Sequence, residues 1–178
     1  EMLPDDVTLV VASDHGFTTE RYEVNLNTWL EDEGWLSYQT KEHDSLADIS
    51  EDARAYSFIP GRLYLNLEGR EPRGSVPESE YEDVRAELKT AIEGLEGPTG
   101  SPVAQRVVTK EDAYRGPHDD IAPDLTVIPT HGYDLKAGFA GNDEVFTTGP
   151  RNGMHSFENA CLFVDDDRAR VDDVDLFD

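Results

Sequence analysis

The run Val7–Ala12 (VTLVVA) constrains the fold more than any other feature of the sequence. It is apolar and rich in β-branched residues, which predicts a strand buried on both faces of a parallel sheet. Ser13, Asp14, His15 and Gly16 follow it directly. In open α/β sheets, ligands bind at the carboxyl ends of such strands. We therefore expect an α/β fold with polar site residues at the end of this strand.

The remaining sequence alternates between helical and strand patterns. Residues 79–95 predict the best helix, because its apolar residues recur three or four positions apart: Tyr81, Val84, Leu88, Ile92 and Leu95. Residues 27–34 predict a shorter helix, capped by Asn25 or Asn27 and ended by Gly34. Strands are expected at residues 55–59, 62–67, 103–108, 124–129 and 160–164. Residues 39–52 and 165–178 are polar and predict irregular segments.

The charge balance indicates the environment of the protein. The 178 residues include 39 acidic and 15 basic side chains, a formal net charge of -24. Seven Tyr, seven Phe and two Trp argue against a disordered acidic segment. We therefore expect a folded, carboxylate-covered protein from a salt-accumulating (halophilic) cell, where salt screens the self-repulsion. Such a surface excludes nucleic acid as a partner.

The single cysteine and the lack of long apolar stretches exclude further kinds of site and location. Cys161 is the only cysteine, which excludes an intrachain disulfide and a cysteine-based zinc cluster; its apolar neighbours predict a small buried side chain. No stretch resembles a membrane span or a signal peptide, so we expect no membrane association and a cytoplasmic location. The oligomeric state is left open. Among the histidines, His43 is expected to be solvated and His118 to lie in a surface loop.

Asp14 and His15 are the strongest candidates for chemistry. Adjacent side chains diverge within a regular strand, but at a strand-to-loop junction both can turn towards one metal ion. Gly16 permits unusual backbone angles at this junction. An imidazole nitrogen with a carboxylate oxygen suits Zn²⁺ and also Mn²⁺. The alternative is that the pair is simply a polar strand end.

Several segments together resemble a known family. Residues 9–17 (LVVASDHGF) are similar to the metal-binding strand end of the alkaline phosphatase superfamily, and residues 153–155 (GMH) with the apolar run 160–164 resemble its last metal-binding histidine. Further similar segments lie between them: 25–30, 34–36, 55–57, 64–67, 69–72, 114–116 and 122–125. The set resembles the type I phosphodiesterase/nucleotide pyrophosphatase branch, in the group of predicted phosphohydrolases and phosphomutases.

The resemblance implies a fold and a site. The fold would be an incomplete alkaline phosphatase-like α/β domain with a mostly parallel sheet and an inserted α+β subdomain. Residues 1–36 and 140–178 would form the metal-site core, and residues 55–139 the inserted subdomain. Asp14 and His15 would hold the metal that contacts the nucleophile, and His155 the second metal. Two divalent ions, Zn²⁺ or alternatively Mn²⁺, would then act on a small phosphorylated substrate.

Other elements of the family pattern are missing from the chain. No histidine is preceded four residues earlier by Asp, so the family's Asp-x-x-x-His motif is absent. Thr18 and Thr19 follow Asp-His-Gly, whereas the family's Thr or Ser nucleophile precedes it. We therefore expect the C-terminal fragment of a longer phosphohydrolase, cut at both ends and inactive alone, which need not bind metal by itself. A phosphomutase of the same superfamily and a non-catalytic acidic binding domain are the alternatives.

Three arginines are candidates for contacts with a phosphate group. Arg62, Arg70 and Arg115 carry the guanidinium groups that pair with phosphate. Arginines on the surface of an acidic protein are the simpler interpretation.

Overall fold

The computed structural model describes residues 7–142, 144–156 and 158–165. The chain divides into two compact units. The first contains the residues up to Thr18 and those from His155 onward, and the second is Thr19–Met154. The expected irregular stretch at 165–178 lies, from residue 166 onward, outside the described residues.

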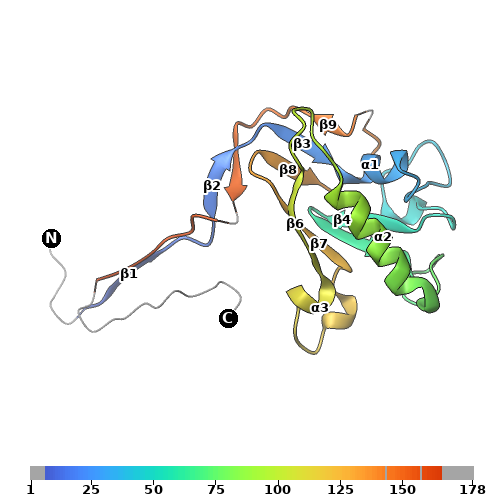
Figure 1. Ribbon diagram of the computed structural model, residues 1–178, viewed down its shortest axis with the longest axis horizontal. Coiled ribbons are helices and arrows are strands. Elements are labelled where there is room, and N and C mark those ends of the chain that lie inside the picture. The colour runs from blue at the N-terminus through green and yellow to red at the C-terminus, as the bar shows by residue number, and fades with distance from the viewer. Residues whose placement is uncertain (1–6, 143, 157, 166–178) are drawn as a thin grey trace. The chain divides into compact units, whose positions relative to one another are not determined.

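Two strand pairs join segments from opposite ends of the sequence. Strand β1 (Leu9–Ala12) pairs antiparallel with β11 (Leu162–Asp165), and the two run side by side as a ribbon (Figure 1). Strand β2 (Gly16–Thr19) pairs with β10 (Gly153–Ser156). Residues near the two ends of the chain are thereby brought together.

The prediction that Val7–Ala12 forms a strand buried in a parallel sheet is wrong. Val10 and Val11 are 56% and 49% exposed, and Phe163 on the partner strand is 56% exposed. Cys161, expected to be buried, is also exposed. The physical reason is that β1 has β11 as its single neighbour among the described strands, so no further strand covers the faces of this ribbon.

The described residues of the second unit include two sheets. One has the order β4 (Ala55–Ile59), β5 (Arg62–Leu65), β7 (Leu125–Pro129) and β6 (Ala104–Thr109), and every neighbouring pair is antiparallel. The other has the order β8 (Tyr133–Lys136), β3 (Tyr22–Asn25) and β9 (Phe146–Thr147).

The described fold is mixed α/β, with mostly antiparallel pairing. Strand β3 runs parallel to β8 and antiparallel to β9. The expected mostly parallel sheet is not what the described strands form. Short connections explain the difference: β4 and β5 are joined by the tight turn at Pro60 and Gly61, where Gly61 has a φ of 71°. Such a hairpin connection enforces antiparallel pairing.

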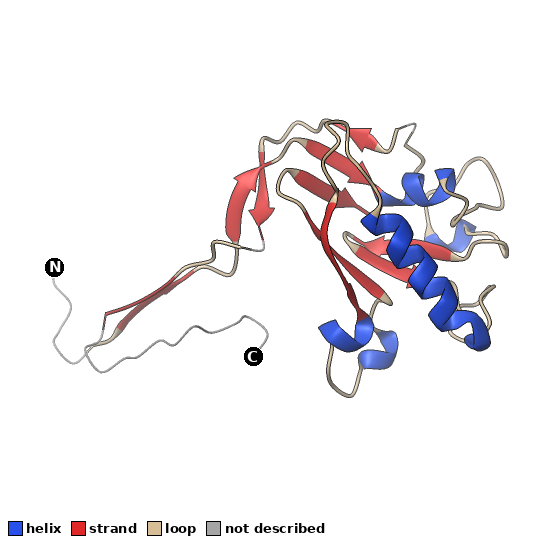
Figure 2. Cartoon of the chain, in the orientation of Figure 1, coloured by secondary structure: helices blue, strands red, loops and turns tan. Residues whose placement is uncertain are grey.

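The helices of the described residues lie in the second unit (Figure 2). The α-helices are α1 (Leu26–Asp32), α2 (Tyr81–Glu93) and α3 (Lys110–Ala113), and the 3₁₀ helices are η1 (Leu46–Asp48), η2 (Glu78–Glu80) and η3 (Asp119–Ile121). Helix α2 confirms the predicted amphipathic helix, because Val84, Leu88 and Ile92 are buried and the helix packs on the four-stranded sheet (Figure 1). Within the described ranges, no helix has the length and apolar character needed to cross a membrane.

Asn27 ties helix α1 to its surroundings. It was predicted as a possible cap, but the cap position is Asn25, whose side chain makes no capping hydrogen bond. Asn27 is instead 3% exposed inside the helix. Its amide donates to the Ser57 carbonyl (2.9 Å) and the Gly138 carbonyl (3.0 Å), and its carbonyl accepts from the Ser57 N–H (2.8 Å). The asparagine therefore satisfies backbone groups of Ser57, in the middle of β4, and of Gly138.

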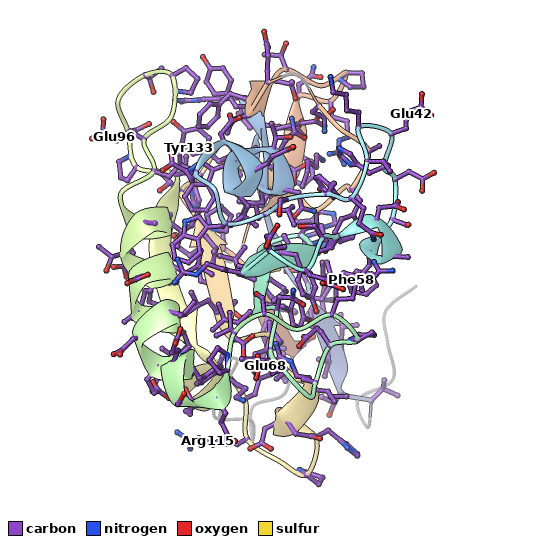
Figure 3. The ribbon with its side chains drawn as sticks, turned by 90° about the vertical axis from the view of Figure 1, so that its right-hand side faces the viewer. Glu42, Phe58, Glu68, Glu96, Arg115 and Tyr133 are labelled. Carbon is purple, nitrogen blue, oxygen red and sulfur yellow. The ribbon has the colours of Figure 1, made fainter. Side chains whose placement is uncertain are left out.

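Many of the acidic side chains lie at the surface of the second unit. Glu42 and Glu96 project outward from loops, whereas Tyr133 is 4% exposed and lies among the core residues (Figure 3).

His43 was expected to be solvated, but its ring stacks on Tyr38 with centroids 3.5 Å apart and its Nδ1 lies 2.6 Å from the Phe139 carbonyl oxygen. The segment at residues 39–52 is therefore anchored by an aromatic contact.

Candidate functional site

The three predicted metal ligands lie on two adjoining segments of the first unit. Asp14 and His15 lie between β1 and β2, and His155 lies in β10, the partner of β2. Two hydrogen bonds close the end of the β1–β11 ribbon beside them: the Ser13 N–H donates to the Cys161 carbonyl (2.8 Å), and the Cys161 N–H donates to Ser13 Oγ (2.7 Å). Strand pairing thus aligns the Asp-His pair with the distant histidine.

The two histidine rings are in direct contact. The centroids of His15 and His155 are 3.7 Å apart, with an angle of 20° between the ring planes. Phe17 lies against His155 with a centroid distance of 6.3 Å. The site is open to solvent, because the side chains of His15 and Asp14 are 38% and 92% exposed.

The environment of His15 determines which ring nitrogen carries the proton. Nδ1 lies 2.7 Å from the carbonyl oxygen of Gly16. A carbonyl oxygen only accepts, so Nδ1 is the donor and Nε2 of the neutral ring keeps its lone pair. That Nε2 lies 3.5 Å from Asp14 Oδ1. A nitrogen lone pair and a carboxylate oxygen therefore lie side by side.

Gly16 allows the two segments to approach each other. A Cβ built at this position would overlap the Glu158 carbonyl oxygen and Ser156 Oγ. Ser156 Oγ in turn donates to the Glu158 carbonyl (2.7 Å). The absence of a side chain at Gly16 therefore lets β2 lie close to β10 and the residues that follow it.

A second acidic group lies in the second unit. Among the described residues, three side chains of types that bind metals lie close together: Glu20, Glu23 and Asp134. One ligand atom from each lies within 4.8 Å of the others. Asp14, His15 and His155 do not form such a group. Sequence reasoning missed the acidic group, because neither strand that carries Glu23 and Asp134 was predicted.

The candidate phosphate-binding arginines have different surroundings. Arg70 forms a bidentate pair with buried Asp124, at 3.0 Å and 2.7 Å, and its Nε donates to Glu71 at 2.8 Å. Asp124 also accepts from the Leu65 N–H (2.7 Å) and the Tyr81 hydroxyl (2.8 Å). Arg70 is therefore occupied by an internal network. Arg115 is exposed, and Arg62 is half-buried.

The sequence matches a protein-family model over most of its length. The model of the type I phosphodiesterase / nucleotide pyrophosphatase family matches residues 1–158, a range that contains Asp14, His15 and His155. Neither the curated proteins nor the solved structures gave a match.

Proposed function

The chain belongs to the type I phosphodiesterase/nucleotide pyrophosphatase family, and we propose that it supplies metal ligands to a hydrolase that cleaves phosphate esters or diesters through a two-metal site. The observation that carries the proposal is the contact between His15 and His155 beside Asp14. The family model supports a phosphoester hydrolase, and this contact supports the metal dependence.

The residues at this site fit a divalent metal ion. The Nδ1–H of His15 donates to the Gly16 carbonyl, which leaves Nε2 free beside the Asp14 carboxylate. Metal-binding histidines commonly hold their second nitrogen in this way, because the hydrogen bond fixes the tautomer and the ring orientation. Mixed nitrogen and oxygen donors favour Zn²⁺, with Mn²⁺ as the alternative.

Each residue has a separate role in this proposal. Asp14 and His15 would hold the ion that contacts the nucleophile. His155 would hold the second ion. When bound, the two ions would stabilise the attacking and leaving oxygens of a displacement on phosphorus. Thr18 and Thr19 lie in β2 after the Asp-His pair, so we assign neither as the nucleophile. The hydroxyl nucleophile and the remaining ligands would come from outside this chain.

The test is an activity assay on the full-length protein that contains this chain. A chromogenic phosphodiester would be hydrolysed with Zn²⁺ or Mn²⁺ in concentrated KCl. Asp14→Ala and His155→Ala should each lower kcat/KM by more than about 100-fold, because each removes a metal ligand. His118→Ala, at an exposed loop histidine, is the matched control and should keep full activity. Full activity in both ligand variants would refute the assignment.

A further inference from the structure

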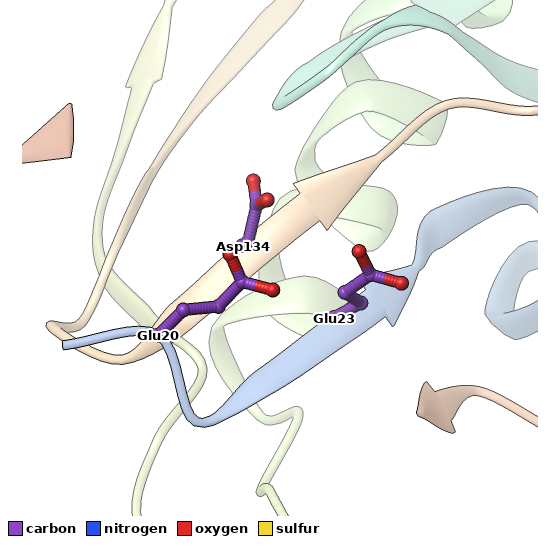
Figure 4. Close-up of side chains that lie close together, drawn as sticks. All are labelled: Glu20, Glu23 and Asp134. Atoms are coloured by element: carbon purple, nitrogen blue, oxygen red, sulfur yellow. The ribbon is translucent and has the colours of Figure 1, made fainter. Parts of the chain in front are cut away.

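The parallel pairing of β3 and β8 places two carboxylates opposite each other. Glu23 in β3 is in register with Asp134 in β8. Like charges directly opposite on neighbouring strands destabilise a sheet unless they are compensated. Glu20, three residues before Glu23, adds a third carboxylate, and one oxygen from each of the three lies within 4.8 Å of the others. Figure 4 shows the three side chains gathered at these two strands.

Glu20 is the unusual member of this group. Its side chain is 2% exposed. Within the described part of the chain, neither carboxylate oxygen of Glu20 has a hydrogen-bond partner. A buried carboxylate without hydrogen bonds is costly, since it has lost its water and gained no donor. Its position therefore requires a compensating positive charge.

Two cationic side chains compensate the group in part. Lys136 Nζ lies 2.5 Å from Asp134 Oδ2 and 3.2 Å from Glu23 Oε1. Arg151 contacts Asp134 at 2.5 Å and Glu23 at 3.6 Å, and its Nε lies 3.4 Å from Glu20 Oε2. Among the residues that the structure describes, three carboxylates against two cations leave one negative charge in excess. The Arg151 side chain is 55% exposed, so it can move into solvent without rearrangement of the core.

The backbone at Gly149 forms one wall of this group. A Cβ at Gly149 would come within 2.6 Å of Glu23 Oε1 and 3.2 Å of Glu20 Oε1. Glycine at this position thus lets the backbone lie close to two of the carboxylate oxygens. A side chain there would displace them.

We propose that Glu20, Glu23 and Asp134 form a binding site for a hard divalent cation, with Ca²⁺ as the best match. All three donors are carboxylates, and carboxylate oxygens are the preferred ligands of Ca²⁺ and Mg²⁺. Ca²⁺ tolerates irregular geometry better than Mg²⁺, which suits a group assembled from two strands and a loop residue. A bound ion would provide the short contact that the Glu20 oxygens do not obtain from a hydrogen bond, and it would join β3 to β8. None of its ligands belongs to the group of Asp14, His15 and His155.

The proposal is tested by titrating the metal-free chain with CaCl₂ at constant high KCl, using calorimetry and thermal unfolding. The wild-type chain should show saturable one-site binding and a melting temperature that rises with Ca²⁺ concentration. Glu20→Gln keeps the side-chain shape and should weaken binding by at least about tenfold. Glu78→Gln, which removes the same charge at an exposed position, should bind as the wild type does.

Arg151→Gln separates a cation site from a simple ion-pair network. If the carboxylates bind Ca²⁺, removal of the competing guanidinium should tighten Ca²⁺ binding. If the group is only an ion-pair network, Arg151→Gln should lower the melting temperature and produce no Ca²⁺ response. Should Glu20→Gln fail to fold, Asp134→Asn takes its place in the titration. Equal Ca²⁺ affinity in the wild type and the carboxylate variant, or no saturable binding to the wild type, would overturn the proposal.

Discussion

His15 and His155 stack with ring centroids 3.7 Å apart, although they lie near opposite ends of the sequence. Strand pairing rather than local sequence creates this contact, since His155 lies in β10 and His15 immediately precedes β2. Asp14 completes the group through its contact with His15 Nε2. The contact leads to the first prediction.

We predict that this chain binds Zn²⁺ only weakly at the Asp14, His15 and His155 group. Catalytic zinc is normally held by three protein ligands. In this chain, one ion would have two protein ligands and the other ion would have a single one. In proton NMR spectra, Zn²⁺ should shift the ring signals of His15 and His155 in fast exchange, and leave those of exposed His118 unchanged. A tight, stoichiometric two-ion complex would contradict this prediction.

Asp124→Asn should lower the free energy of unfolding by about 3 kcal/mol or more, because it leaves the guanidinium of Arg70 without its buried counter-charge. Asp124 is fully buried and accepts hydrogen bonds from Arg70, Tyr81 and the Leu65 N–H. Asp83→Asn on the exposed side of α2 is the matched control, with an expected change within about 0.5 kcal/mol. Chemical denaturation in concentrated KCl measures both. A loss at Asp124 no larger than at Asp83 would show that the network contributes little.

Thermal stability should increase steeply with salt. The net charge of -24 produces self-repulsion in the compact state. The Debye length falls from about 30 Å at 0.01 M salt to about 3 Å at 1 M. The melting temperature should therefore climb with KCl, whereas sorbitol at equal osmolality should give a smaller rise. A melting temperature independent of KCl would argue against a halophilic origin.

Stability should fall at alkaline pH through tyrosines that are buried fully or in part. Burial raises the pKa of four phenols above the ordinary value near 10: those of Tyr38, Tyr56, Tyr64 and Tyr81. A folded-state pKa above the unfolded value means that this contribution is complete below pH about 10 and is lost as the pH rises further. The melting temperature should therefore drop above pH about 10.

Tyrosinate absorbance provides the matching measurement. In the folded chain, four of the seven tyrosines should ionise late, and in guanidinium chloride all seven should ionise near pH 10. If all seven ionise together near pH 10 under native conditions, the burial of these phenols is not as described.

Local patterns in the sequence were sufficient for several elements of the fold. The spacing of Val84, Leu88 and Ile92 predicts helix α2, and the turn at Pro60 and Gly61 predicts the β4–β5 hairpin; both are present. These elements depend on short-range periodicity and turn chemistry, which the sequence contains in full. The motif around Asp14 and His15 likewise pointed to the family that the family model supports.

The tertiary structure alone decided which residues meet and which strands are covered. The apolar run at β1 predicts burial, but an apolar strand is buried only where neighbours cover it, and β11 is its single described neighbour. The pairing of Glu23 with Asp134, and the burial of Glu20 beside them, arise from the parallel register of β3 and β8. Such long-range register depends on the packing of the whole chain, so no local pattern in the sequence encodes it.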